Sequence, residues 1–214
     1  RFMKTKQHRE IYNKNLLHPW GDLSDLGNDD SSSVIVKGDG IYIFDSDGNR
    51  MIDGPAGMWC MQTGYGRREI ADAVSQQMLN LSYATSFTLI NNKETELAKR
   101  ISENTPGDLN RIYFTTGGST AVDSALRLCQ LASNIKGKNT KKQILTREKA
   151  YHGSTYLSAS VTGKERDKTA MDVKKDGIHF LSAPCHFYFP QFKSEGEFCD
   201  FLINELKEKI VEVG

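Results

Sequence analysis

Two adjacent glycines and two hydroxyl residues stand just before the most clearly helical stretch of the chain, in the run Tyr-Phe-Thr-Thr-Gly-Gly-Ser-Thr-Ala over residues 113–121. The first N–H groups of a helix lack partners within the helix, and the helix dipole places about half a positive charge there. Gly117 and Gly118 allow close approach of an anion, and Ser119 and Thr120 add hydroxyl donors. The segment is therefore a candidate phosphate cup, although such a pattern alone is more often an ordinary capped helix start.

This candidate cup does not fit the two most familiar nucleotide-binding motifs. A P-loop ends in Gly-Lys followed by Ser or Thr, and the dinucleotide-binding fingerprint is G-x-G-x-x-G. Neither pattern occurs in residues 113–121. Nucleoside triphosphates and NAD are therefore disfavoured as ligands.

A second candidate is the sequence Ala-Tyr-His-Gly-Ser-Thr over residues 150–155, which follows another predicted strand. Parallel sheets bind ligands at the carboxyl edge of their strands, where Tyr151 would offer a flat face to a planar ring. His152 has an ordinary pKa of about 6.5, which suits proton transfer near neutral pH. Because a lone histidine beside a turn is more often structural, we assign it no proton-transfer role.

A third candidate is the glycine- and proline-rich loop over residues 53–60, which carries one large aromatic side chain, Trp59. A tryptophan in such a loop is either a plug of the core or the wall of a ligand pocket. The residues alone leave both alternatives open.

The elements that must position the first two candidates alternate in type from residue 111 onward. We predict strands over residues 111–115, 143–146 and 178–181, followed in turn by helices over residues 119–135, 155–161 and 195–213. Strand and helix in turn require crossover connections. The predicted fold class is therefore α/β, with a mostly parallel sheet flanked by helices.

The chain before this alternation is of a different kind. Up to Ser33 it is polar, which predicts an arm, and short β-branched runs separated by Gly-containing turns predict a three-stranded meander over residues 34–53. Apolar spacing predicts a helix that begins near Ile70 and another over residues 93–103.

Composition excludes several classes of function. Lys plus Arg number 28 against 27 Asp plus Glu, so a net charge of +1 provides no broad field for nucleic acid or an anionic membrane surface. No run approaches the ~20 apolar residues that span a bilayer, and no apolar run follows the basic start as in a secretory signal. We therefore expect a cytoplasmic protein with no nucleic-acid or membrane partner.

The cysteines and histidines show no metal-binding spacing. The cysteines form no C-x-x-C pair and are read as reduced thiols: Cys60, Cys129, Cys185 and Cys199. Cys185 and His186, even with His179, match no familiar zinc pattern. The Asp-rich turn over residues 45–49 lacks the later glycine and closing acidic residue of an EF-hand. No metal site is expected.

Six short motifs occur in one order along the chain, at residues 17–20, 45–49, 52–54, 57–60, 64–67 and 151–155. They read Leu-His-Pro-Trp, Asp-Ser-Asp-Gly-Asn, Ile-Asp-Gly, Gly-Met-Trp-Cys, Gly-Tyr-Gly-Arg and Tyr-His-Gly-Ser-Thr. In this order they resemble the N-terminal half of class III aminotransferases of the ω-amine:pyruvate type, which depend on pyridoxal 5'-phosphate (PLP). The resemblance runs from about Leu17 to the end of the chain.

The resemblance implies a homodimeric enzyme with the PLP-dependent transferase fold type I. Residues 1–66 would form the N-terminal arm and the β-meander, as part of a small domain. Residues 67–214 would form the first part of the large PLP-binding domain. The remainder of the large domain and the C-terminal part of the small domain would lie outside this chain.

The resemblance also implies a set of cofactor-binding residues. Gly118 and Ser119 match the phosphate-binding pair of the family, and Tyr151 matches the aromatic residue that lies against the pyridine ring. Thr120 and His152 complete the cofactor site that we expect. The family commonly has Glu at the position of Thr120, a departure that backbone N–H groups would tolerate.

For the substrate, Trp59 matches the aromatic residue of the amine pocket, and Trp20 and Phe87 match other pocket-lining positions. The family's Schiff-base lysine and the aspartate that faces the pyridine nitrogen lie beyond Gly214. We therefore expect no catalytic residue within this chain.

The implied activity moves an amino group from a primary or ω-amine donor to a 2-oxo acid, with pyruvate as the expected acceptor, by a ping-pong mechanism. Two alternatives stay open. The protein could be another class III enzyme, such as an aminomutase or a decarboxylating transaminase, or a catalytically inactive protein with the PLP fold.

Overall fold

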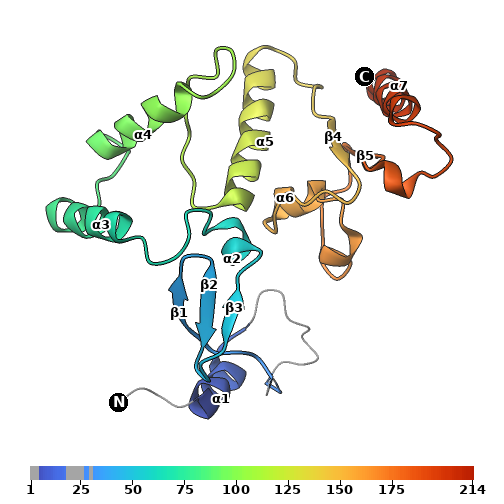
Figure 1. Cartoon of the computed structure of the whole chain (residues 1–214). Coiled ribbons are helices and arrows are strands. Elements are labelled where there is room, and N and C mark those ends of the chain that lie inside the picture. Colours follow the sequence, from blue (N-terminus) through green and yellow to red (C-terminus); the bar gives the residue numbers. More distant parts are fainter. Residues whose placement is uncertain (1–4, 18–26, 29–30) are drawn as a thin grey trace. The chain divides into compact units, whose positions relative to one another are not determined.

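The computed structural model describes residues 5–17, 27–28 and 31–214 (Figure 1). The chain divides into two compact units, Arg1–Thr95 and Glu96–Gly214. These units are not the domains predicted from the sequence, which would include segments outside this chain. The predicted domain boundary after Gly66 therefore stays a prediction.

The first unit is built around a three-stranded antiparallel sheet in the order β1-β2-β3 (Figure 1). Its strands are β1 (Ile35–Asp39), β2 (Tyr42–Asp45) and β3 (Arg50–Ile52). The meander predicted from the sequence is therefore present. Helices α2 (Ala56–Trp59) and α3 (Arg68–Asn80) follow it, and α4 (Asn92–Ser102) begins in this unit.

The turn between β2 and β3 is closed by the carboxylate of Asp45, which is 7% exposed. Its Oδ1 accepts the N–H groups of Asp47 and Asn49 at 3.0 and 2.8 Å, and its Oδ2 accepts the side-chain amide of Asn49 at 2.8 Å. These bonds, above all that from the Asn49 side chain, lower the pKa of Asp45. The carboxylate of Asp45 thus serves the hairpin turn.

The polar N-terminal segment contains a helix that the sequence analysis did not predict, α1 (Thr5–Asn15). No side chain of α1 is buried, so no apolar stripe marked it as helical. Helix-forming residues and the Lys6–Glu10 ion pair, 4.0 Å between Nζ and Oε1, are the local features that favour it.

The second unit pairs two parallel strands, β4 (Ile144–Arg147) and β5 (Ile178–Leu181), in the register Ile144 to Ile178. The helices around them are α5 (Gly118–Ile135), α6 (Tyr156–Val161) and α7 (Glu195–Val213). Helix α5 packs against α6, and α7 against β5 (Figure 1). These elements match the predicted alternation closely.

The prediction of a strand over residues 111–115 is wrong. This segment is not assigned as a strand, and none of the described residues pairs with it in a ladder. A β-branched and aromatic composition favours an extended backbone, but only hydrogen bonds to a neighbouring strand make it part of a sheet.

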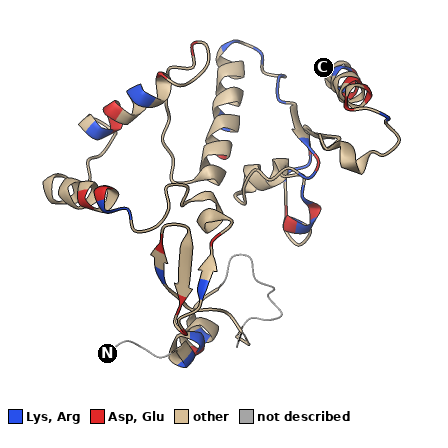
Figure 2. Cartoon of the chain, in the orientation of Figure 1, with Lys and Arg blue, Asp and Glu red and all other residues tan. Residues whose placement is uncertain are grey.

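The core of the second unit lies between the parallel pair, α6 and α7. Its buried apolar side chains are Ala159, Val161, Ile178, Leu181, Ala183 and Phe198. Among the described helices, none is long and apolar enough to cross a bilayer. Figure 2 shows basic and acidic residues interleaved along α4 and α7, whereas α5 carries few charges.

Candidate functional site

The candidate phosphate cup lies at the N-terminus of α5, where the helix begins as the sequence predicted. The first bond of the helix runs from the N–H of Ala121 to the carbonyl of Gly117, 3.0 Å, so the three preceding N–H groups have no acceptor within the helix. A Cβ atom added at Gly117 or Gly118 would meet no atom within 4 Å. No acidic residue lies in the first turn (Figure 2). The helix end is open to an anion.

The two hydroxyl residues of the cup are used differently. Ser119 Oγ accepts the N–H of Ser154 at 3.1 Å, which leaves the hydroxyl hydrogen of Ser119 available as a donor. Thr120 Oγ1 instead donates to the carbonyl of Gly117 at 2.8 Å. Thr120 therefore offers its backbone N–H to an anion, and its hydroxyl caps the turn.

The loop over residues 151–154 lies directly against this cup. Gly153 has φ 129°, and a Cβ atom there would lie 2.5 Å from Ser119 Oγ and 2.6 Å from Ser158 Oγ. Thr155 Oγ1 also donates to the carbonyl of Ser119, at 3.3 Å. Two motifs that the sequence analysis treated separately are thus brought together, and Gly153 is required for their close approach.

A carboxylate joins the two helices that carry these loops. Asp123, in the second turn of α5, accepts the N–H of Ser158 at 2.7 Å, close to the start of α6. Such a bond satisfies one of the N–H groups that a helix start leaves without a partner. The contact holds the N-termini of α5 and α6 close together. No role for Asp123 was predicted from the sequence.

Tyr151 and His152 are both half-buried. The Nζ of Lys164 lies over the ring of Tyr151, 5.6 Å from its centroid. The N–H of His152 donates to Thr162 Oγ1 at 3.0 Å. His152 is therefore fixed through its backbone, and the structure adds no contact that gives its ring a chemical role.

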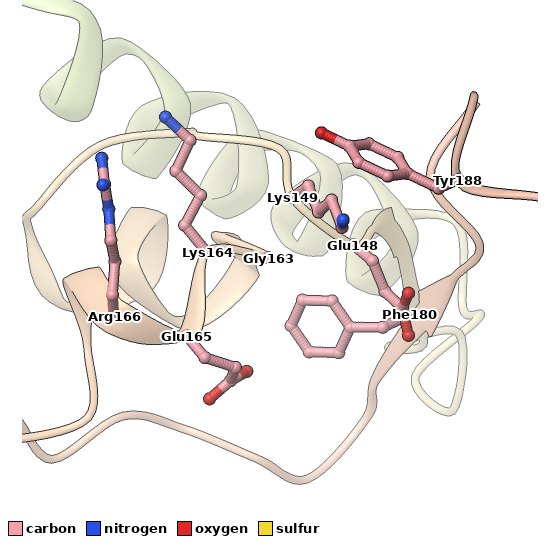
Figure 3. Close-up of a pocket in the computed structure, with 8 residues that line it drawn as sticks. All are labelled: Glu148, Lys149, Gly163, Lys164, Glu165, Arg166, Phe180 and Tyr188. Carbon is pink, nitrogen blue, oxygen red and sulfur yellow. The ribbon is translucent and has the colours of Figure 1, made fainter. Parts of the chain in front are cut away.

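The residues before the Tyr151 loop, Glu148 and Lys149, line an open groove of about 740 Å³ that was not predicted from the sequence. In Figure 3 the ring of Phe180 points into the groove, toward the side of Glu165. The Nζ of Lys149 lies 3.2 Å from the centroid of the Tyr188 ring. The groove is lined by Glu148, Lys149, Gly163, Lys164, Glu165, Arg166, Phe180 and Tyr188.

The aromatic residues expected in the amine pocket belong to the first unit. Trp59 is 69% exposed and Phe87 is 95% exposed, so within the described chain neither is a plug of the core. Trp20 lies outside the described residues.

The loop that carries Trp59 has an unusual backbone, held by one carboxylate. Ala56, Met58 and Trp59 all have positive φ, at 48°, 54° and 70°. Asp53 Oδ2 accepts the N–H of Gly57 at 2.8 Å and the hydroxyl of Tyr65 at 2.6 Å.

Tyr65 connects this loop to the meander. The side-chain hydrogen bond to Asp53 raises the pKa of Tyr65, because ionised Tyr65 would lose that bond. A Cβ atom at Gly38 of β1 would lie 2.5 Å from the ring of Tyr65, so the ring packs directly on that glycine. Asp53 and Tyr65 both lie in motifs that carried the family resemblance, but sequence reasoning gave them no role.

Comparison with known proteins decides the family of this chain. Residues 24–213 match the family model described as Aminotransferase class-III. The chain belongs to the class III aminotransferases. Their solved structures also identify its fold as part of fold type I of the PLP-dependent transferases.

Individual relatives agree with this family. A putrescine–pyruvate aminotransferase of Pseudomonas aeruginosa is 34% identical over 99% of this chain and 46% of its own length. A diaminobutyrate–2-oxoglutarate transaminase of Halomonas elongata is 31% identical over 97% of this chain and 46% of its own length. A thermostable (S)-enantioselective ω-transaminase from Thermomicrobium roseum has a TM-score of 0.94 at 31% identity, over 100% of this chain and 48% of its own. The chain spans about half the length of the relatives it matches.

The residues of the cup fit the cofactor that this family uses. PLP combines a phosphate with a flat aromatic ring. The start of α5 offers N–H groups and open space beside Gly117 and Gly118, and the adjoining loop offers the ring of Tyr151. An anion site and an aromatic face on adjoining loops are what such a molecule needs.

Proposed function

We propose that the complete protein is a PLP-dependent aminotransferase that moves an amino group from a primary or ω-amine to a 2-oxo acid, with pyruvate as acceptor, by a ping-pong mechanism. One observation carries this proposal. The N-terminus of α5 and the Tyr151 loop meet through the bond from the Ser154 N–H to Ser119 Oγ, at 3.1 Å. The candidate anion site and the loop that carries Tyr151 therefore adjoin in a member of the class III family, which supports the proposal.

Within this site the backbone N–H groups of Gly118, Ser119 and Thr120 bind the phosphate, and the Ser119 hydroxyl donates a further hydrogen bond. Tyr151 would lie against the ring of the cofactor, and His152, whose N–H donates to Thr162, would lie beside it. When bound, PLP supplies the electron sink that stabilises a carbanion at the substrate carbon. The protein supplies position and charge complementarity around it.

The amine pocket is assigned to Trp59, with Phe87 and Trp20 as further lining residues. Support comes from the exposure of Trp59 and Phe87. A related thermostable ω-transaminase, 30% identical, was engineered for the synthesis of enantiopure bulky amines by replacing a tryptophan with glycine. We propose that Trp59 occupies the equivalent position and limits the size of the amine.

We further propose that the protein acts as a homodimer in the cytoplasm. Large apolar side chains are exposed between α3 and α4, with Tyr83 at 77%, Phe87 at 95% and Ile90 at 85%. Apolar surface of this kind is commonly covered by a second subunit.

The activity is tested by incubating the complete, PLP-loaded protein with pyruvate and one amine at a time: putrescine, β-alanine, taurine or an arylalkylamine. The expected result is that pyruvate is converted to alanine with one of these donors, which becomes the corresponding aldehyde or ketone. Release of carbon dioxide, or conversion of an amine without any 2-oxo acid, would instead show a decarboxylating transaminase or an aminomutase. Failure to bind PLP would show an inactive protein with this fold.

A further inference from the structure

Three residues around the end of α6 have fully buried hydroxyl groups: Ser158, Ser160 and Thr162 are 0%, 2% and 1% exposed. A buried hydroxyl without partners is costly, so each is expected to serve a hydrogen bond. The hydroxyl of Ser160 makes no contact with the Tyr151 loop in these bonds: it donates to the carbonyl of Tyr156 at 2.6 Å and accepts the N–H of Lys174 at 2.9 Å. Thr162 is different, because its hydroxyl contacts the Tyr151 loop.

The Thr162 hydroxyl connects two residues of the Tyr151 loop to Ser158 of α6. Its Oγ1 accepts the N–H of His152 at 3.0 Å. The same oxygen lies 3.2 Å from the carbonyl of Gly153 and 2.9 Å from the carbonyl of Ser158, and its single hydrogen serves one of them at a time. One side chain therefore holds the backbone on both sides of the peptide that joins His152 to Gly153.

The residue after Thr162 continues this contact along the loop. The N–H of Gly163 donates to the carbonyl of Ala150 at 2.8 Å, and its carbonyl accepts the N–H of Lys149 at 2.9 Å. A Cβ atom at Gly163 would lie 2.1 Å from the carbonyl oxygen of Arg147, so only glycine fits. Figure 3 shows Gly163 and Lys164 beside Lys149 on the side that faces the groove.

We propose that Thr162 is a positioning residue of the cofactor site: its hydroxyl fixes the loop over residues 151–154, so that Tyr151 meets the cofactor ring and Gly153 stays packed on Ser119. The inference rests on the proposed function, since it assigns the loop to PLP. Thr162 is 1% exposed, so it would act through the backbone of His152 and Gly153. A valine would fill the same space but leave the His152 N–H without its acceptor.

The test compares Thr162→Val with Thr162→Ser in the complete protein, and uses Ser160→Ala as a matched control. The control removes an equally buried hydroxyl, two residues earlier at the end of α6, that has no hydrogen bond to the loop. Two quantities are measured: the dissociation constant for PLP, and the amide hydrogen exchange of residues 150–155 in the protein without PLP.

We expect Thr162→Val to raise the PLP dissociation constant roughly tenfold, the order of effect of one buried N–H left unpaired, and to speed exchange in residues 150–155. Thr162→Ser should restore both values, while Ser160→Ala should lower the melting temperature and leave both near wild type. Wild-type exchange and affinity in Thr162→Val would overturn the inference, as would an equal loss in Ser160→Ala.

A second variant keeps the test decisive if Thr162→Val does not fold. Thr162→Cys has a similar volume and a weaker hydrogen-bonding group, so the same two changes are expected in smaller measure. If the wild-type protein did not bind PLP, the proposed function would fall. The exchange measurement would still decide whether Thr162 fixes the loop.

Discussion

The phosphate cup in the second unit and the Trp59 loop in the first are held in opposite ways. Around the cup, buried hydroxyls and close glycine contacts fix the backbone: Thr162 is 1% exposed, and Gly153 leaves no space for a Cβ atom beside Ser119. The Trp59 loop is exposed, and the carboxylate of Asp53 accepts hydrogen bonds from its Gly57 N–H and from Tyr65. We infer that the backbone beside the proposed cofactor site is fixed by buried contacts, whereas the backbone beside the proposed amine pocket is fixed by exposed ones.

Backbone strain deepens this contrast. Ala56, Met58 and Trp59 are non-glycine residues with positive φ, a conformation that costs on the order of 1–3 kcal/mol each when the surroundings do not favour it. Such strain persists only where neighbouring contacts maintain it. The conformation of the Trp59 loop should therefore change when Asp53 or Tyr65 is replaced. The cup should change mainly when a larger side chain replaces a closely packed glycine.

The largest effect is expected from Gly153→Ala. The new Cβ atom would lie 2.5 Å from Ser119 Oγ, at a φ of 129° that other residues rarely adopt. We expect PLP affinity to fall roughly a hundredfold, about 3 kcal/mol. Gly137→Ala is the control, because Gly137 has φ 70° with no atom near its added Cβ, and it should leave PLP binding intact. Titration with PLP measures both, and unchanged affinity in Gly153→Ala would refute the rigid cup.

The next effect is that of Ser119→Asp, which places a negative charge where the phosphate is expected. Charge repulsion should weaken PLP binding by about tenfold or more. Ser119→Asn is the matched control, because it has the same size without the charge and should lose less. Equal affinities of the Asp and Asn variants would remove the phosphate from the start of α5.

A smaller change in binding but a clear change in selectivity is expected from Trp59→Ala. Removing the exposed indole opens the pocket, so the ratio of kcat/KM for a bulky arylalkylamine to that for a diamine should rise by about tenfold. The PLP dissociation constant should stay at its wild-type value. Trp59→Phe keeps an aromatic wall, so its kcat/KM ratio should lie between those of the wild type and Trp59→Ala. An unaltered amine profile in Trp59→Ala would remove Trp59 from the pocket.

The smallest effect is expected from Tyr65→Phe, which removes one of the two donors to Asp53. The amine preference should shift in the same direction as in Trp59→Ala, but only a few-fold. Tyr42→Phe, in β2 of the meander, is the control and should leave the amine preference unchanged. Identical amine profiles of Tyr65→Phe and the wild type would show that the loop does not depend on this bond.

The same bond predicts a dependence on pH. The pKa of Tyr65 is raised in the folded protein by its hydrogen bond to Asp53. Its stabilising effect should be fully present below the ordinary tyrosine pKa of about 10, and lost as the pH rises through the higher folded value. Hydrogen exchange of residues 53–60 measured across this range should show the loss in the wild type and not in Tyr65→Phe.

Local patterns predicted some parts of this molecule from the sequence and could not predict others. The spacing of apolar residues predicted α5, and the turn residues predicted the meander. Each of these signals depends on residues that are close together in the sequence. The segment over residues 111–115 was wrongly predicted as a strand, since pairing depends on a neighbour. Helix α1 was missed, since it buries no apolar stripe.

The candidate site shows the same division. The glycines and hydroxyls before α5 and the aromatic residue at 151 were visible as motifs. The contact between Gly153 and Ser119 joins residues far apart in sequence and follows only from tertiary packing. Thr162 carried no signal, because a threonine at a helix end is ordinary until its hydroxyl is seen to hold His152.

The central claim is tested most directly by the visible absorbance of the complete protein with PLP, before and after addition of each amine. We predict that the band of bound PLP disappears with one donor and returns when pyruvate is added, because the amino group then passes to the acceptor. A band that forms but responds to no amine, or that never forms, would contradict the proposal that the complete protein is an amine:pyruvate aminotransferase.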